Sequence, residues 1–185
     1  LYLFAVAAAA PWLAWRAART GRYRRHLAAK LLGDVTPRPR DGRPTAWFHG
    51  VSVGEVHLLA TLVAAFRARH PGWRVVVSAT TDTGLAEATN RFPDLAGAGA
   101  GRSLRAGRAR DAVRPTVVVL AESELWPNFL TAANARRVPV VVANARVSPR
   151  SFARLGRVKG AARRLLLGRV TTFAAQADET ADRLL

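Results

Sequence analysis

The chain has 185 residues, half of them hydrophobic, with five Trp and seven Phe, which supports a buried core and excludes a disordered basic tail. It has no cysteine, which excludes disulfides, thiol catalysis, zinc fingers and iron–sulfur clusters, whereas metal sites made of His, Asp and Glu stay open. The formal net charge of +17 predicts attraction to polyanions: nucleic acid, anionic lipid or a phosphorylated substrate.

The first fifteen residues are uncharged and almost wholly apolar, and a strongly basic stretch follows them. Fifteen helical residues reach only ~22 Å, short of the ~30 Å hydrocarbon core, so this segment predicts a shallow membrane anchor, with a buried helix as the alternative. The arginines behind it are typical of a cytoplasmic exit near anionic head groups, and they stand on the wrong side for a signal peptide. We therefore predict an anchor and basic juxtamembrane helix over 1–33, then a Pro-rich linker over 34–44.

Beyond the linker, short apolar runs alternate with helical patterns. Apolar residues at three- and four-residue spacing predict helices, for example over 56–70 and 128–137. Runs rich in Val, Phe and Trp predict strands over 45–48, 74–78, 116–120, 138–143 and 170–174. Such alternation, with near-continuous apolar strands, favours a parallel sheet with helices on both faces. The fold class predicted for 45–185 is therefore α/β, a Rossmann-like domain.

Polar loops follow four of these strands, at the edge where ligands bind in sheets of this kind. The first, from His49 to Glu55, contains the pattern S-x-x-E at Ser52 to Glu55. This pattern is typical of a capping box, in which Glu55 bonds back to the Ser52 amide. The alternative makes Glu55 a general base, kept ionised by the positive end of the helix, with Gly54 leaving space for a substrate. The side chain can also alternate between the two roles. As a base, Glu55 is expected to be open to water and to lie near Glu122 or Arg146.

The loop after the second strand is rich in hydroxyl groups and opens another helix. Exposed amides and hydroxyls at such a helix start can hold a phosphate. Ordinary capping of the helix by Thr or Asp is the alternative. The candidate ligands in this loop are Thr80, Thr81, Thr83 and Gly84.

The loop after the third strand carries two carboxylates, Glu122 and Glu124, which alternation should point in different directions. One is expected to hold a donor such as Arg146 or backbone amides, and the other to face the cleft. Pro127 fits the first turn of the helix that follows. Asn144 and Arg146, after the fourth strand, complete the predicted edge.

Three other patterns in the sequence lack the features that a ligand-binding role would require. The Gly-rich run 97–101 follows no predicted strand and opens no clear helix, so it is interpreted as a flexible linker rather than a dinucleotide loop. The four histidines show no metal-ligand spacing. The basic run 101–114 lacks interleaved aromatic residues, so we expect a solvated loop and no nucleic-acid partner.

Five segments, in this order and spacing, resemble the N-terminal half of the 3-deoxy-D-manno-octulosonic acid (Kdo) transferases of lipopolysaccharide assembly: WFHGVSVGEV, SATTDTG, ESELWPN, NARVSPRSF and AQADETADRL. The resemblance implies a membrane-bound glycosyltransferase with two Rossmann-like domains (GT-B type), working at the cytoplasmic face of the inner membrane. It would move Kdo from CMP-Kdo to the lipid A precursor lipid IVA with inversion, and with neither a metal nor a cofactor.

The resemblance also assigns residues. It makes Glu55 the catalytic base and maps a second required carboxylate onto Glu122, with Glu124 less certain. Substrate contacts are expected at the other polar positions of this edge: Ser52, Gly54, Thr80, Thr81, Thr83, Gly84, Glu124, Asn144 and Arg146.

Two departures from the family pattern qualify these expectations. The Gly- and Arg-rich segment 95–113 replaces a short strand and a Pro-x-Asp stretch, which puts that sheet edge and its acceptor contacts in doubt. The chain lacks methionine and ends within a helical pattern, so we expect a fragment without the nucleotide-sugar domain and without turnover of its own. The competing hypothesis is a non-catalytic basic module that binds membranes or nucleic acid on a Rossmann-like scaffold.

Overall fold

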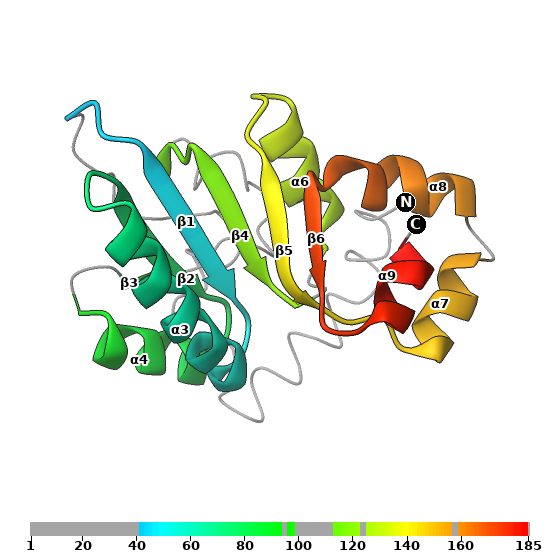
Figure 1. Ribbon diagram of the computed structural model, residues 1–185, viewed down its shortest axis with the longest axis horizontal. Helices are drawn as coiled ribbons and strands as arrows, with labels where there is room; N and C mark the ends of the chain where they lie inside the picture. Colours follow the sequence, from blue (N-terminus) through cyan, green and yellow to red (C-terminus); the bar gives the residue numbers. More distant parts are fainter. Residues whose placement is uncertain (1–40, 94–95, 99–112, 123–124, 157–158, 185) are drawn as a thin grey trace, which may run out of the picture.

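The computed structural model describes residues 41–93, 96–98, 113–122, 125–156 and 159–184. Its centre is a six-stranded sheet in the order β3-β2-β1-β4-β5-β6, with every neighbouring pair parallel (Figure 1). The strands are β1 (Thr45–Gly50), β2 (Arg74–Ala79), β3 (Ala96–Ala98), β4 (Val117–Ala121), β5 (Val140–Ala145) and β6 (Thr172–Ala175). The predicted parallel Rossmann-like sheet is confirmed, and each of the five predicted strands is present with its ends shifted by two residues or fewer.

Helices cover both faces of this sheet, as predicted. One face packs against α3 (Val53–Arg69) and α4 (Asp82–Arg91), and the other packs against α6 (Pro127–Asn134). After β5 the chain forms α7 (Pro149–Gly156), α8 (Lys159–Leu165) and the 3-10 helix η1 (Leu167–Arg169), and after the edge strand β6 it forms α9 (Asp178–Leu184). The helix starts follow local chemistry: Ser52 caps α3, Thr81 caps α4, and Pro127 occupies the first turn of α6.

Strand β1 lies in the middle of the core and is buried along its whole length. Alternation sends Trp47 into the cluster with α6, where its ring meets Phe129 edge-on at 5.4 Å, and sends Phe48 into the cluster with α3. Burial of a large apolar side chain of this kind contributes ~1.5–3 kcal/mol. Two apolar faces explain why the strand sequences are almost continuously hydrophobic.

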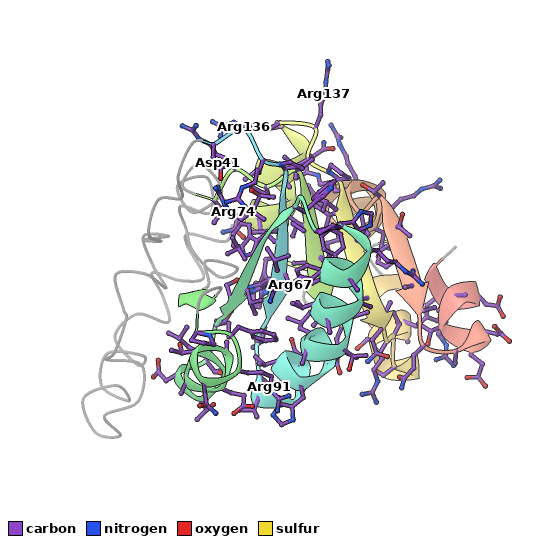
Figure 2. The ribbon with its side chains drawn as sticks, turned by 60° about the vertical axis from the view of Figure 1, so that its left-hand side comes forward. Asp41, Arg67, Arg74, Arg91, Arg136 and Arg137 are labelled. Carbon is purple, nitrogen blue, oxygen red and sulfur yellow. The ribbon has the colours of Figure 1, made fainter. Side chains whose placement is uncertain are left out.

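The amino-terminal edge of the sheet is held by ion pairs. Asp41 contacts Arg43 and Arg74 at 2.6 Å each, which ties the entry to β1 to the first residue of β2 (Figure 2). The hydrogen bond from Arg43 lowers the pKa of Asp41 below its usual value. Arg136 and Arg137 lie at this same edge, away from the strand ends where ligands are expected.

The flexible-linker prediction for 97–101 is wrong at Gly97 and Ala98, because Ala96–Ala98 forms β3 against β2, with Ala96 opposite Val77. An edge strand this short is defined by backbone pairing to one neighbour, and Gly and Ala give no apolar pattern that would predict it. The rest of this run and most of the basic run 101–114 lie outside the described residues. The solvated-loop prediction for 101–114 is wrong at Val113, which is 2% exposed and belongs to the core cluster of Trp47.

The predicted anchor helix, the basic stretch over 1–33 and the linker up to residue 40 also lie outside the described residues. Within the described part, every helix is too short or too polar to span a bilayer.

Candidate active site

The strand order places a topological switch point between β1 and β4, because the chain proceeds from β1 toward β3 on one side and from β4 toward β6 on the other. Open α/β sheets bind ligands in the crevice at the carboxyl ends of strands at such a point. Glu55 lies in the first turn after β1, and Glu122 directly follows β4. The two carboxylates predicted to be catalytic therefore flank the switch point.

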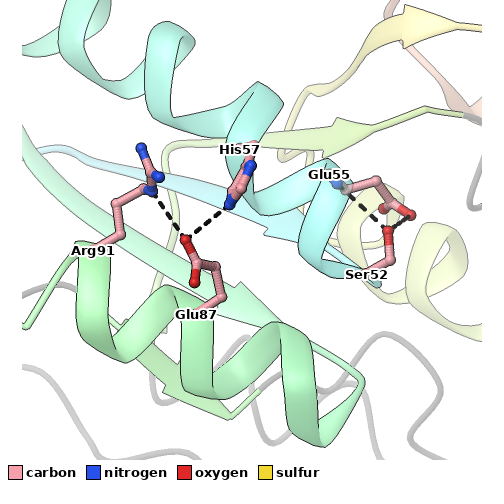
Figure 3. A network of polar contacts seen from close by, with 5 residues as sticks. All are labelled: Ser52, Glu55, His57, Glu87 and Arg91. Atoms are coloured by element: carbon pink, nitrogen blue, oxygen red, sulfur yellow. Dashed lines mark hydrogen bonds and ion pairs between the residues drawn. The ribbon is translucent and has the colours of Figure 1, made fainter.

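Glu55 folds back into a cap at the start of α3 (Figure 3). The Ser52 hydroxyl donates to its Oε1 at 3.1 Å and accepts from the Glu55 amide at 3.4 Å. The Val51 amide donates to its Oε2 at 2.7 Å. The capping-box interpretation is confirmed, but the carboxylate reaches the Val51 amide rather than that of Ser52.

Burial corrects one expectation. We expected Glu55 to be open to water, whereas its residue is only 8% exposed. Gly50 makes this possible, since a Cβ there would lie 3.1 Å from the Glu55 Cβ. Gly54, by contrast, is exposed, and a Cβ there would meet only the Ser52 Oγ, at 4.0 Å. The predicted open space beside the start of α3 is therefore present, although the carboxylate itself faces inward.

The loop after β2 acts as a clamp on the loop after β1. The Thr81 hydroxyl donates to the Val51 carbonyl at 2.6 Å and accepts from the Gly84 amide at 3.1 Å. The Thr83 hydroxyl lies 3.5 Å from that of Thr81, and a Cβ on Gly84 would come within 2.8 Å of the same oxygen. Capping by Thr81 is confirmed, whereas phosphate binding by this loop stays a prediction, because the Thr81 hydroxyl and the Gly84 amide already bond within the protein.

The clamp reaches Glu55 through one residue. The carbonyl of Val51 accepts from the Thr81 hydroxyl and the Thr81 amide, and its amide donates to the Glu55 carboxylate. The second loop therefore holds the residue whose amide orients the carboxylate.

The α3 and α4 helices are also joined on their exposed side (Figure 3). Glu87 of α4 accepts from His57 of α3 at 2.8 Å and from Arg91 at 3.2 Å. The His57 bond is the main cause of a lowered Glu87 pKa. These three residues are separate from the capped Glu55 carboxylate, so Glu87 can serve as the position of a control variant.

Glu122 and Asn144 lie side by side at the ends of β4 and β5, where the Glu122 amide donates to the Ala143 carbonyl at 2.8 Å. Both have left-handed backbone, with φ of 54° and 56°, which is uncommon for residues other than Gly. The β5–β6 register also shifts between Val142 and Ala145. Backbone of this kind gathers at ligand sites, and the hydrophobic pattern does not reveal it.

Glu122 pairs with Arg146 at 3.7 Å, so the prediction that one carboxylate of this loop holds Arg146 is confirmed. The side chains are 37% and 61% exposed, and such a pair contributes only ~0–1 kcal/mol. Glu124 lies outside the described residues.

His49 was placed with the polar edge by the sequence, but it belongs to β1 and is 1% exposed. Its Nδ1 lies 2.8 Å from the Ser78 hydroxyl, which also accepts from the Trp47 Nε1 at 2.8 Å. Its Nε2 lies 3.3 Å from the Thr80 hydroxyl. Burial lowers the His49 pKa to about 4, so the ring is neutral at pH 7. The sequence analysis missed this group, which strand alternation could have indicated because it puts Trp47 and His49 on one face.

Among the residues that the structure describes, no group of three or more His, Asp or Glu side chains is arranged to hold a metal ion. The predicted metal-free, cofactor-free reaction stays a prediction.

Fold and site together define a Rossmann-like α/β domain whose ligand edge carries carboxylates on both sides of the switch point. A Listeria monocytogenes protein assigned as a UDP-N-acetylglucosamine 2-epimerase has a similar fold, with a TM-score of 0.53 and 11% identity over 77% of this chain and 41% of that one. At this identity the likeness concerns the fold alone. A family model described as 3-Deoxy-D-manno-octulosonic-acid transferase (kdotransferase) matches residues 16–185, and the chain belongs to this family.

Curated Kdo transferases are similar along much of the chain. The Bordetella pertussis protein is 33% identical over all of this chain and 45% of its own length. The Chlamydia pneumoniae protein is 32% identical over 76% of this chain and 33% of its own length. The chain thus spans between a third and a half of these relatives and corresponds to the N-terminal portion of the family.

Proposed function

We propose that this chain is the acceptor-binding part of a glycosyltransferase that moves Kdo from CMP-Kdo to the lipid A precursor lipid IVA. The observation that carries the proposal is Glu55, held in a fixed orientation beside a switch point whose other side carries Glu122 and Arg146. Membership of the Kdo transferase family supports the reaction class.

In the proposed reaction, Glu55 is the general base. Its Oε2 stays with the Val51 amide while its Oε1 exchanges the Ser52 hydroxyl for the acceptor hydroxyl. The Oε1 takes the proton of that hydroxyl, and the acceptor oxygen bonds to the anomeric carbon of Kdo. The bond from that carbon to the phosphate oxygen breaks, CMP leaves with the electron pair, and the configuration inverts. The carboxylate keeps its bond to the Val51 amide while the Ser52 hydroxyl is exchanged, so it need not leave its buried place.

Two further features of the site fit this chemistry. The positive end of α3 favours the ionised form of the Glu55 carboxylate before the reaction. Because this dipole is fixed in place, it needs no reorganisation during the reaction. Arg146, whose side chain is 61% exposed at the carboxyl edge of the sheet, would bind a phosphate of the donor or of the glycolipid through its guanidinium. Ser52, Gly54, Thr80 and Asn144 complete the proposed substrate edge.

The surroundings of the reaction belong to the same proposal. The chain would work at the cytoplasmic face of the inner membrane, where its charge of +17 attracts anionic lipid and the phosphates of the acceptor. The CMP-Kdo donor would be held mainly by a second domain, as expected for an enzyme of the two-Rossmann-domain type.

The test uses the full-length gene product with labelled CMP-Kdo and lipid IVA in detergent, and it follows labelled lipid by thin-layer chromatography. We expect label in the lipid with CMP-Kdo and none with labelled UDP-N-acetylglucosamine. Arg146→Gln should raise KM for the substrate whose phosphate Arg146 binds, either CMP-Kdo or the glycolipid. Glu87→Gln on the surface of α4 should leave transfer unchanged. A protein that binds anionic vesicles but moves no Kdo would refute the proposal and favour the non-catalytic membrane module.

A further inference from the structure

A line of polar side chains crosses the sheet from its core to its carboxyl edge. It begins at the Trp47 Nε1, which donates to the Ser78 hydroxyl at 2.8 Å, and continues to the His49 Nδ1 at 2.8 Å. It ends where the His49 Nε2 meets the Thr80 hydroxyl at 3.3 Å. Three of these four residues are 1% exposed or less, and the His49 ring lies nearly parallel to that of Phe129. Burial of polar groups costs free energy unless they are hydrogen-bonded, so this buried network is a candidate for a functional role.

The tautomer of His49 determines which groups donate and which accept along this line. In the tautomer with a bare Nδ1, the Ser78 oxygen accepts from Trp47 and donates its single proton to the His49 Nδ1. A neutral imidazole that accepts at Nδ1 carries its proton on Nε2, and this N–H then donates to the Thr80 oxygen. The Thr80 hydroxyl, engaged as an acceptor, keeps its own proton for a further partner.

Thr80 places its hydroxyl at the carboxyl edge of the sheet, where substrate contacts are predicted. It is the first residue after β2, it is 7% exposed, and its amide donates to the Gly50 carbonyl at 3.2 Å. Gly50 leads directly into the loop with Val51 and Ser52, and it packs against Glu55. A buried hydroxyl with a fixed acceptor side therefore lies next to the loop of the proposed base.

We propose that His49 is a positioning residue that fixes the Thr80 hydroxyl as a hydrogen-bond donor to a hydroxyl or phosphate oxygen of the glycolipid acceptor. The inference rests on the proposed function, because it places the acceptor at this edge. The role of His49 is to choose the direction of the Thr80 hydroxyl and not to exchange protons with the substrate.

Variants with amide side chains distinguish the roles of the two ring nitrogens of His49. In His49→Gln the amide nitrogen takes the place of Nε2, so the donor to Thr80 is kept. In His49→Asn the amide reaches only the place of Nδ1, so the contact with Ser78 is kept and the donor to Thr80 is lost. Thr80→Val removes the hydroxyl at almost the same volume, and Thr80→Ser keeps it.

Steady-state kinetics of the full-length gene product, with the acceptor and CMP-Kdo varied in turn, test the proposal. We expect His49→Asn and Thr80→Val each to raise KM for the acceptor by about tenfold, the cost of one lost hydrogen bond. KM for CMP-Kdo should stay unchanged, and His49→Gln and Thr80→Ser should stay within about threefold of the unmodified protein. The double variant His49→Asn/Thr80→Val should be no worse than Thr80→Val alone, because both changes remove one interaction.

Additive effects of the two changes, or an equal loss of kcat in His49→Gln and His49→Asn, would assign His49 to packing alone and overturn the inference. A second measurement needs no variant activity: nitrogen NMR of the histidine-labelled full-length protein at pH 7 should show His49 neutral with its proton on Nε2. A proton on Nδ1 would reverse the line of donors and overturn the inference as well. If the unmodified protein transfers no Kdo at all, the proposed function fails, and the NMR result still decides the direction of the network.

Discussion

The buried imidazole of His49 makes the stability of the domain depend on pH. Burial lowers its pKa to about 4, against 6.5 for an unburied His, so the unfolded chain binds a proton at this residue in a range where the folded chain does not. Stability is therefore full above pH 6.5 and is lost as the pH falls from there toward 4. At ~1.36 kcal/mol for each pH step of this gap, the loss between pH 7 and pH 4 is about 3 kcal/mol. This is a large fraction of the ~5–15 kcal/mol that stabilises a typical domain.

Urea unfolding of the chain at pH 7, 5.5 and 4 measures the effect, with His49→Gln as the matched control, because Gln keeps the donor to Thr80 and does not titrate. All other titrating groups are common to both proteins, so their contributions cancel in the difference. With a slope of ~2 kcal/mol per molar urea, the midpoint of the unmodified chain should fall by about 1.5 M more than that of the variant. Parallel pH profiles for the two proteins would refute the buried neutral imidazole.

Three further predictions follow from the same edge of the sheet. Gly84→Ala should destabilise the domain by about 1–3 kcal/mol in thermal unfolding, because its Cβ would press on the Thr81 hydroxyl and the Val51 carbonyl, whereas Gly72→Ala, which meets nothing within 4 Å, should not. Glu122→Gly should keep or raise stability by up to about 1 kcal/mol, since Gly tolerates the φ of 54°, while transfer falls; a loss of stability would contradict the left-handed backbone. The 185-residue chain alone should bind lipid IVA but show no transfer in the labelled-donor assay, and any turnover would place the donor site within these residues.

Local chemistry explains how much of the fold could be predicted. The strands are apolar on both faces because both faces are buried, so runs such as 74–78 and 116–120 point directly to a parallel sheet. The helix starts are predictable because Ser52 and Thr81 are good capping residues and Pro127 suits the first turn. Strand β3 was not predictable in this way, since its sequence, Ala-Gly-Ala, gives no apolar pattern.

The candidate site was predicted as a set of residues but not as a geometry. The order of the loops along parallel strands places Glu55 and Glu122 at one edge, and the pairing of Glu122 with Arg146 follows from their neighbouring strands. The burial of Glu55 depends on the missing side chain at Gly50, and the left-handed Asn144 lies where the register between β5 and β6 shifts. Both are tertiary effects, which the spacing of residues along the chain does not encode.

The role of Glu55 as the base that takes the acceptor proton is the central claim, and the most direct test is Kdo transfer by Glu55→Gln in the full-length gene product. Gln has nearly the same shape and can still accept from the Val51 amide, so thermal unfolding should stay close to that of the unmodified protein. The account predicts that kcat falls by about 10²–10⁴-fold, the usual contribution of a positioned base, while KM for the acceptor changes little. Transfer within tenfold of the unmodified rate, or a variant that no longer folds, would contradict it and leave Glu55 as a helix cap.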